Sequence, residues 1–299
     1  MTYPKHFIDT VTSTFDGGAE WLQQLPEIIT QCEARWNLTA HDHFPTLSYN
    51  YAAPATIADG TAVVLKIGVP RDELITEMDA LKLYNGRAIC RLIDADMGMG
   101  VLIIERLTPG KMLLELANDD EATQIAAQLM KQLWRPVPAA HNFPSVADWS
   151  KGLNRLRETF GGGTGPFSRK LVETAESVFT DLLNDPVEPV VLHGDLHHYN
   201  ILSAQREPWL AIDPKGVVGD PAYEVGAFLH NPLDFLTWPD WQTIVPRRLD
   251  IMAEMLEIDR QRLVAWSLAQ DVLSTWWHYE GEGKVDEMPL AAMLWQELS

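Results

Sequence analysis

The sequence predicts an α+β fold of two lobes, a small β-rich N-terminal lobe and a larger helical C-terminal lobe. Strand-like apolar runs dominate residues 46–104, whereas most of the chain beyond Pro109-Gly110 has the character of helices. A chain of 299 residues is long enough to build a core in each lobe. We place the connection near residues 105–110, which predicts domains of 1–106 and 107–299.

The N-terminal lobe is expected to begin with polar, helix-compatible sequence up to about Leu38. Asp59-Gly60 is a strong signal for a tight β-hairpin turn between two strands. Residues 71–84 are expected to form an amphipathic helix that Asn85-Gly86 ends. Strands are expected over 46–51, 55–57, 61–67, 88–93 and 101–104.

The C-terminal lobe is expected to contain several long helices, over 121–134, 147–160, 167–183 and 262–279. The glycine-rich run 161–165 superficially resembles a phosphate-binding loop. It lacks the following Lys-Ser/Thr pair and comes after a helical stretch rather than a strand. We therefore expect it to be a connection between two helices.

Composition excludes several classes of partner. Apolar content of 46% and charged content of 22% are typical of a soluble globular protein. A formal net charge of −19 argues against nucleic acid and anionic membranes as partners, while it could concentrate cationic small molecules or simply aid solubility. With only two cysteines, Cys32 and Cys90, and no apolar leader or membrane-length run, we expect a cytoplasmic monomer or homodimer.

Three polar residues predict the chemistry of the protein. Asp195 and Asn200 lie five positions apart between apolar runs, and Asp213 ends a short apolar strand. Buried polar groups need partners, since each unpaired group costs roughly 1–3 kcal/mol. An aspartate base followed by amide and carboxylate ligands for Mg²⁺ is the arrangement that phosphoryl transfer from a nucleotide requires.

A lysine in the N-terminal lobe can supply the contact with the nucleotide. Lys66 alternates with apolar residues on its predicted strand, so its side chain can point into a cleft and bind phosphate oxygens. Glu77 on the following helix is the best carboxylate partner, and Glu73, one turn earlier, is the second. An exposed surface pair is the alternative, and such pairs contribute little to stability.

The string His193 to Leu202, together with 212–216 and 219–224, closely resembles the aminoglycoside phosphotransferase family. Residues 213–226 and 273–277 are similar to its streptomycin 6-phosphotransferase and hydroxyurea kinase branch. The resemblance extends from Lys66 to about Trp277. It implies a protein-kinase-like fold with ATP at the hinge, and it implies the following site residues: Asp195 as base, Asn200 and Asp213 as Mg²⁺ ligands, Lys66 paired with Glu77, and the backbone from Glu105 to Leu107 against the adenine.

Departures from protein kinases indicate a small-molecule acceptor. Gly194 replaces an arginine that anchors the activation loop in those enzymes, and only six residues separate Asp213 from Asp220. That interval is too short for a peptide-docking segment. The loop expected over the phosphates, residues 49–53, lacks glycines, so nucleotide orientation there must depend on other geometry.

Two other functional classes remain as alternatives. The side chains His193, Asp195, His197 and His198 could suggest a zinc hydrolase. The kinase interpretation instead has His193 bonded within the catalytic loop, His197 near the transferred phosphate and His198 at the surface. A catalytically inactive nucleotide-binding module is the second alternative, although none of the expected catalytic positions is visibly missing.

The acceptor is expected to lie over the helical lobe, where carboxylates and indole faces suit a cationic or polyhydroxylated molecule. For the tryptophans, ordinary core packing is the more frequent role. Streptomycin-like aminocyclitols, hydroxyurea and an unidentified metabolic alcohol or amino sugar all stay open as acceptors. The candidate wall residues are Glu224, His230, Asn231, Asp271, Trp276 and Trp277.

Overall fold

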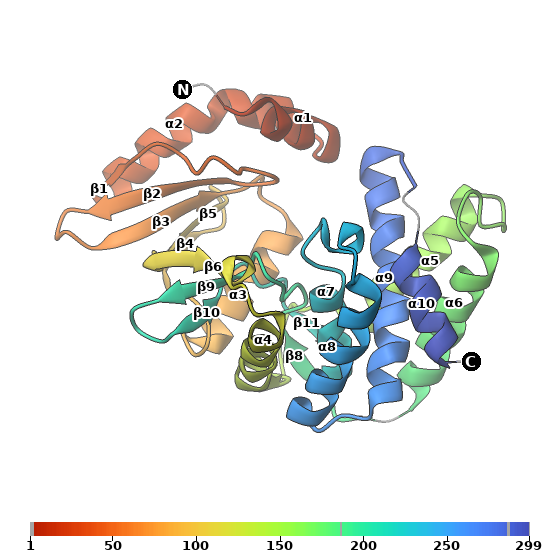
Figure 1. The fold of residues 1–299 in the computed structure, drawn as a ribbon. Helices are drawn as coiled ribbons and strands as arrows, with labels where there is room; N and C mark the ends of the chain where they lie inside the picture. The colour runs from red at the N-terminus through yellow and green to blue at the C-terminus, as the bar shows by residue number, and fades with distance from the viewer. Residues whose placement is uncertain (1–2, 186, 286–287, 299) are drawn as a thin grey trace.

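A five-stranded antiparallel sheet forms the N-terminal part of the computed structural model, which describes residues 3–185, 187–285 and 288–298. Figure 1 shows this sheet on the opposite side of the molecule from most of the helices. Its spatial order is β1-β2-β3-β5-β4. The strands are β1 (Leu38–Ala40), β2 (Tyr51–Ile57), β3 (Ala62–Ile67), β4 (Leu92–Asp96) and β5 (Val101–Glu105).

Two helices cover one face of this sheet, α1 (Lys5–Thr14) and α2 (Gly18–Trp36), and α3 (Asp72–Tyr84) belongs to the other face (Figure 1). The alternation of side chains along a strand explains this division. In β3, the apolar residues at 63, 65 and 67 are buried in a core cluster shared with α1 and α2. Lys66 therefore points to the opposite side, toward α3.

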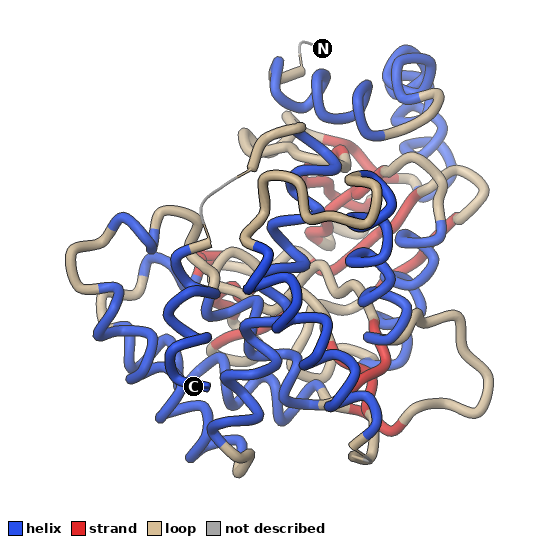
Figure 2. The backbone as a smooth tube through the Cα atoms, turned by 90° about the vertical axis from the view of Figure 1, so that its right-hand side faces the viewer, coloured by secondary structure: helices blue, strands red, loops and turns tan. Residues whose placement is uncertain are grey.

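The C-terminal part is built mainly of helices around a long central helix, α9 (Arg260–Glu282). Figure 2 shows these helices gathered below the sheet, and α9 packs against α5, α6, α7, α8, α10 and the short helix η2. The other helices are η1 (Leu113–Glu115), α4 (Asp119–Leu133), α5 (Val146–Thr159), α6 (Arg169–Asn184), η2 (Pro221–Glu224), α7 (Val225–Leu229), η3 (Phe235–Thr237), α8 (Trp241–Leu256) and α10 (Pro289–Leu298).

Two small antiparallel sheets lie between the large sheet and these helices. One has the order β10-β9-β6 and the other β11-β8-β7. Their short strands hold the polar loops that the sequence singles out, because those loops lie between β8 and β9 and between β10 and β11. The strands are β6 (Pro109–Met112), β7 (Arg135–Pro136), β8 (Val190–Leu192), β9 (Ile201–Ala204), β10 (Trp209–Ala211) and β11 (Val217–Gly219).

The predicted α+β class with a small sheet lobe and a larger helical lobe is confirmed. The helices expected over 71–84, 121–134, 147–160, 167–183 and 262–279 correspond to α3, α4, α5, α6 and α9, and the run 161–165 connects α5 to α6. The Asp59-Gly60 hairpin joins β2 to β3. The division at residue 106 stays a prediction.

Two strand predictions were wrong. Residues 46–50 form no strand and bend at 48–50, so that β2 begins only at Tyr51 and continues through Pro54. Residues 88–91 are not part of β4, although Ile89 makes an isolated bridge to Ala211. The chain bends there instead of extending, and Ala88 has a positive φ of 59°. Among the described helices, none has the length and apolar character needed to cross a bilayer.

Candidate active site

A polar loop between β8 and β9 carries Asp195, and the Glu224 carboxylate holds this loop from behind. Its two oxygens each accept one backbone N–H, from His193 at 2.8 Å and from Gly194 at 2.8 Å. Gly194 has a φ of +83°, and a Cβ there would lie 2.9 Å from Val217 Cγ1. An arginine cannot occupy this position, which explains the glycine on packing grounds.

His193 ties the loop to the neighbouring strand. Its Nε2–H donates to the Ile212 carbonyl at 2.8 Å, and its Nδ1 accepts the N–H of Asp195 at 3.3 Å. The acceptor role of Nδ1 requires the neutral imidazole, and burial lowers the pKa of His193 to about 4. The predicted bonding of His193 within the loop is therefore present.

Asn200 and Asp213 meet beside Asp195. The Asn200 Nδ2 donates to the Asp195 carbonyl at 2.9 Å, and the Ile212 N–H donates to the Asn200 carbonyl at 2.9 Å. Asp213 has a positive φ of 58°, a backbone conformation that is rare for residues other than glycine and that often occurs at functional sites. Both side chains line the same small cavity. Their amide and carboxylate oxygens are donors of the kind that Mg²⁺ prefers, so the residues present fit that ion.

Lys66 is the centre of a buried charge cluster. Its Nζ lies 2.7 Å from Glu77 Oε1 and 3.2 Å from Asp213 Oδ1. Burial disfavours the ammonium, but the two carboxylates outweigh it and raise the pKa of Lys66 above its ordinary value. The structure thus brings together the lysine, its predicted partner and one predicted metal ligand.

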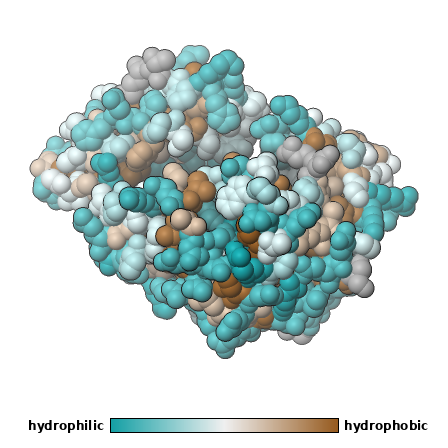
Figure 3. Space-filling model, in the orientation of Figure 1, coloured by the Kyte–Doolittle hydropathy of each residue, from teal (hydrophilic) through white to brown (hydrophobic). Residues whose placement is uncertain are grey.

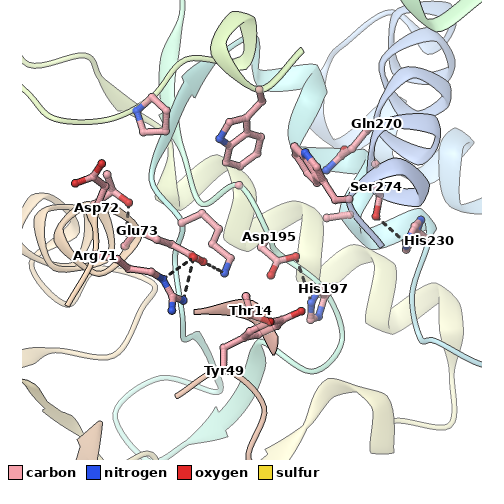
Figure 4. A pocket seen from close by; sticks show the side chains of 18 of the residues that line it. Thr14, Tyr49, Arg71, Asp72, Glu73, Asp195, His197, His230, Gln270 and Ser274 are labelled. Carbon is pink, nitrogen blue, oxygen red and sulfur yellow. Dashed lines mark hydrogen bonds and ion pairs between the residues drawn. The ribbon is translucent and has the colours of Figure 1, made fainter. Parts of the chain in front are cut away.

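Two adjoining cavities meet at Asp195. The larger has a volume of about 1010 Å³ and lies toward the helices, whereas the smaller, of about 240 Å³, contains Lys66, Asn200 and Asp213. Figure 3 shows the face of the molecule seen in Figure 1, where hydrophilic residues predominate and hydrophobic residues form scattered patches. His197 lines both cavities, and its Nε2 lies 3.4 Å from Asp195 Oδ1 (Figure 4).

One face of α9 forms part of the wall of the larger cavity. Gln270, Ser274 and Trp277 follow the i, i+4, i+7 spacing of a single helix face, and all three line the cavity. His230 and Asn231 also line it, as predicted from the sequence. Figure 4 shows His230 beside Ser274, on the opposite side of Asp195 from Arg71 and Glu73.

Three predicted wall residues do not line either cavity and need correction. Glu224 is buried behind the Asp195 loop, as described above. Asp271 is buried behind His230, where it contacts His230 Nδ1 at 2.7 Å and accepts the Ala291 N–H at 3.0 Å. Trp276 packs in an aromatic cluster with Phe160 and Phe167, which is the core role that tryptophan has most often.

The histidine at 198 was placed wrongly at the surface. It is buried, stacks on Phe228 at a centroid distance of 4.2 Å and lies beside the Arg248 guanidinium. His193 and His198 therefore point to different partners. Within residues 3–185, 187–285 and 288–298, no three His, Cys, Asp or Glu side chains are grouped as a metal-binding cluster.

Several residues that line the cavities are not indicated by any pattern in the sequence. Thr14 and Phe15, at the end of α1, reach the larger cavity, and nothing in their local sequence signals this. Arg71 and Lys215 line both cavities. Lys215 lies in the motif that follows Asp213, but the motif by itself indicates no role for it.

The residues predicted to form the hinge, Glu105 and Leu107, contact other parts of the protein rather than the two cavities. The Glu105 carboxylate pairs with Arg206 at 3.0 Å, and the Glu105 N–H donates to the Arg91 carbonyl at 2.8 Å. Leu107 is buried, and neither residue lines the two cavities described above. A role for the backbone of 105–107 in binding adenine stays a prediction.

Comparison with known proteins identifies sequence relatives along most of the chain. A family model described as aminoglycoside/hydroxyurea antibiotic resistance kinase matches residues 35–281. A streptomycin 6-kinase from Streptomyces glaucescens is 31% identical over 283 residues, covering 94% of this chain and 91% of the relative. A hydroxyurea phosphotransferase from Kitasatospora aureofaciens is 31% identical over 280 residues, covering 92% of this chain and 79% of the relative.

Solved structures share the fold at low sequence identity. A choline kinase from Streptococcus pneumoniae superposes with a TM-score of 0.62 at 14% identity, covering 91% of this chain and 96% of that one. At this identity the likeness concerns the fold alone. The fold is accordingly the protein-kinase-like one that the sequence predicts.

Proposed function

The chain belongs to the aminoglycoside/hydroxyurea antibiotic resistance kinase family and is a phosphotransferase, and we propose that it transfers the γ-phosphate of ATP to a hydroxyl group of a streptomycin-type or hydroxyurea-type acceptor. The observation that carries this proposal is the position of Asp195, which is shared by the two cavities. One cavity has residues suited to the phosphates of a nucleotide and a divalent metal, and the other has room for a small-molecule acceptor.

The residues around the smaller cavity would act mainly by positioning. Lys66 would bind phosphate oxygens, while Asn200 and Asp213 would hold Mg²⁺, which supplies charge neutralisation on the triphosphate. Asp195 would orient the acceptor hydroxyl and take its proton as the new bond forms. Burial alone would raise the pKa of Asp195, but His197 and nearby cations outweigh it and lower this pKa, so the group is ionised at neutral pH.

The size of the larger cavity favours a streptomycin-type acceptor. A volume of about 1010 Å³ suits a drug-sized ligand, whereas a molecule as small as hydroxyurea would fill little of it. Asp72 places a carboxylate on the wall, and the indoles of Trp149 and Trp277 line it as well. A carboxylate and aromatic faces are suitable partners for guanidinium groups.

The remaining expectations follow from this activity. We propose that the backbone of residues 105–107 contacts the adenine and that the protein works in the cytoplasm, where ATP is available. A net charge of −19 supports small molecules rather than nucleic acid or anionic membranes as partners. A monomer or a homodimer is compatible with the proposal.

An acceptor screen tests the proposed function. ADP release would be measured with Mg·ATP and streptomycin, hydroxyurea or small polyols, and phosphorus NMR would identify any product. We expect streptomycin-dependent ADP release and a new phosphomonoester signal. If neither streptomycin nor hydroxyurea is phosphorylated while a polyol is, the acceptor assignment is wrong and a metabolic alcohol replaces it.

A further inference from the structure

Six residues line both cavities and so mark the place where a phosphoryl group would pass from nucleotide to acceptor: Tyr49, Arg71, Glu73, Asp195, His197 and Lys215. Two of them, Arg71 and Lys215, carry a positive charge at neutral pH. We propose that Arg71 and Lys215 form a cationic clamp that binds the oxygens of the phosphoryl group during transfer, with Glu73 as the positioning residue. This inference rests on the proposed phosphotransfer function.

Glu73 holds the two cations on the same side of the junction. Its Oε2 accepts the Arg71 Nε–H at 3.1 Å and lies 3.0 Å from Arg71 Nη2. Its Oε1 accepts from Lys215 Nζ. Glu73 balances one of these two cations, and the remaining positive charge lies near the ionised Asp195 carboxylate.

Both cations come from segments that the fold positions firmly. The Lys215 N–H donates to the His193 carbonyl at 2.8 Å, which fixes it relative to the Asp195 loop. Arg71 lies directly before α3, and its guanidinium carbon is 4.3 Å from the centre of the Phe15 ring. The end of α1 thus supports the clamp from the N-terminal side.

The clamp retains hydrogen-bond donors for a ligand. Arg71 Nη1 is buried and has no hydrogen-bond partner among the described residues. A buried guanidinium N–H without an acceptor is costly, so a ligand oxygen at this position would be favourable. The Lys215 side chain is 37% exposed and lines both cavities.

The chemistry of transfer explains why further cations are useful here. The acceptor oxygen forms a bond to the γ-phosphorus, the bond from that phosphorus to the β–γ bridging oxygen breaks, and the acceptor proton goes to Asp195. Negative charge on the three phosphoryl oxygens must pass close to the Asp195 carboxylate. Lys66 is already balanced by Glu77 and Asp213, so it offers little surplus charge.

The clamp is consistent with the lack of glycines in the segment before β2. Residues 48–50, which line the smaller cavity, include none of the glycines that let a backbone approach phosphates closely. Side-chain cations at Arg71 and Lys215 can provide the donors that such a backbone cradle would otherwise supply. The alternative is a purely structural ion cluster that joins α3 to the loop before β11.

Binding of a transition-state mimic separates these two roles. The probes are Mg·ADP alone and Mg·ADP with aluminium fluoride, whose anion mimics the phosphoryl group in transit. Calorimetry would compare wild type with Arg71→Met, Lys215→Met and Lys215→Arg. Lys151→Met, a change of an exposed lysine on α5, is the matched control. Thermal unfolding would establish that each variant is folded.

We expect aluminium fluoride to tighten binding of Mg·ADP to wild type, the control and Lys215→Arg. In each methionine variant, the gain in affinity that aluminium fluoride adds to Mg·ADP binding should fall about tenfold or more, whatever the variant's affinity for Mg·ADP alone. The clamp is wrong if folded methionine variants keep the full gain, or if wild type binds Mg·ADP and gains nothing. Failure of wild type to bind Mg·ADP would instead contradict the proposed function.

Discussion

The ammonium of Lys66 lies 2.7 Å from the Glu77 carboxylate, and both side chains are almost fully buried. Lys66 comes from β3 and Glu77 from α3, so this contact joins the sheet to the helix behind it. A buried ion pair is strongly destabilised when one partner is removed, because the other charge is left without compensation. The pair therefore fixes the position of the Lys66 ammonium, which we propose binds a phosphate oxygen.

Replacing Glu77 by glutamine should weaken nucleotide binding. Lys66 then keeps only Asp213 as a carboxylate partner and moves toward it, which takes the ammonium away from the phosphates. We expect the affinity for Mg·ATP to fall about tenfold, measured by calorimetry. Glu173→Gln breaks an exposed pair with Arg169 and is the control. Equal affinities for the two variants would contradict a positioning role for Glu77.

The same helix shows why the sequence left a choice between two glutamates. Glu73 and Glu77 are four residues apart and therefore share one face of α3. Both were acceptable partners for Lys66. In the structure each serves a different lysine, Glu77 contacting Lys66 and Glu73 contacting Lys215. Helical spacing predicted that both glutamates lie on one face of α3. It could not predict which of them pairs with Lys66, because the partner of Glu73, Lys215, comes from a segment distant in sequence.

Trp276 and Trp277 are adjacent in sequence, but Trp276 packs in the core and Trp277 lines the larger cavity. Trp276→Ala should lower the free energy of unfolding by about 3–5 kcal/mol, because the side chain is only 1% exposed in its aromatic cluster. Trp277→Ala should affect stability less but raise the KM for the acceptor several-fold, since it removes cavity wall. Thermal unfolding and steady-state kinetics measure the two effects. A reversed pattern would contradict the described wall of the cavity.

Trp276 and Trp277 also show that the sequence could not predict which face of α9 lines the cavity. Gln270, Ser274 and Trp277 face the cavity, whereas Asp271 and Trp276 lie on other faces of α9. The orientation of a helix that is buried on most sides cannot be obtained from its apolar pattern. In contrast, Lys66 lies on a strand whose alternating core residues predicted its direction.

Asp72 offers a test of acceptor charge. Asp72→Asn should raise the KM for streptomycin by about fivefold, because an exposed ion pair contributes about 1 kcal/mol or less. The kcat should change little, since Asp72 does not contact Asp195. A neutral polyol, if it is accepted at all, should show no such change. An unchanged KM for streptomycin would exclude Asp72 as the partner of a guanidinium group.

Burial of His193 predicts a loss of stability in acid. The unfolded chain takes up a proton near the ordinary pKa of 6.5, whereas the native histidine does so only near its pKa of about 4. Between these two pKa values the unfolded state binds more protons than the native state. The contribution of neutral His193 to the free energy of unfolding is therefore fully present above pH 6.5 and is lost as the pH falls toward 4.

Protonation linked to His193 should lower the free energy of unfolding by about 2 kcal/mol between about pH 7.5 and pH 5. This corresponds to a fall of roughly 3 °C in the unfolding midpoint. Scanning fluorimetry of wild type and His193→Gln at both pH values measures it. The variant lacks this titration and should lose correspondingly less on acidification. Identical pH dependence in the two proteins would show that His193 is not held neutral.

The trio of Asp195, Asn200 and Asp213 could be predicted because its members lie close together in the sequence, in a recognisable pattern. Two of its members lie in one short loop, and the third follows a strand that pairs with β9. The residues at the end of α1 could not be predicted in the same way. Thr14 and Phe15 reach the larger cavity only because α1 and α2 fold over the sheet, and no local motif records that contact.

The central claim is that Asp195 orients and deprotonates the acceptor between the two cavities. The most direct test is the rate of ATP-dependent phosphorylation of streptomycin, or of the acceptor found in the screen, by Asp195→Asn. We expect kcat to fall about a thousandfold while the affinity for Mg·ADP stays within about twofold of wild type. A variant that retains a kcat close to that of wild type would contradict the account.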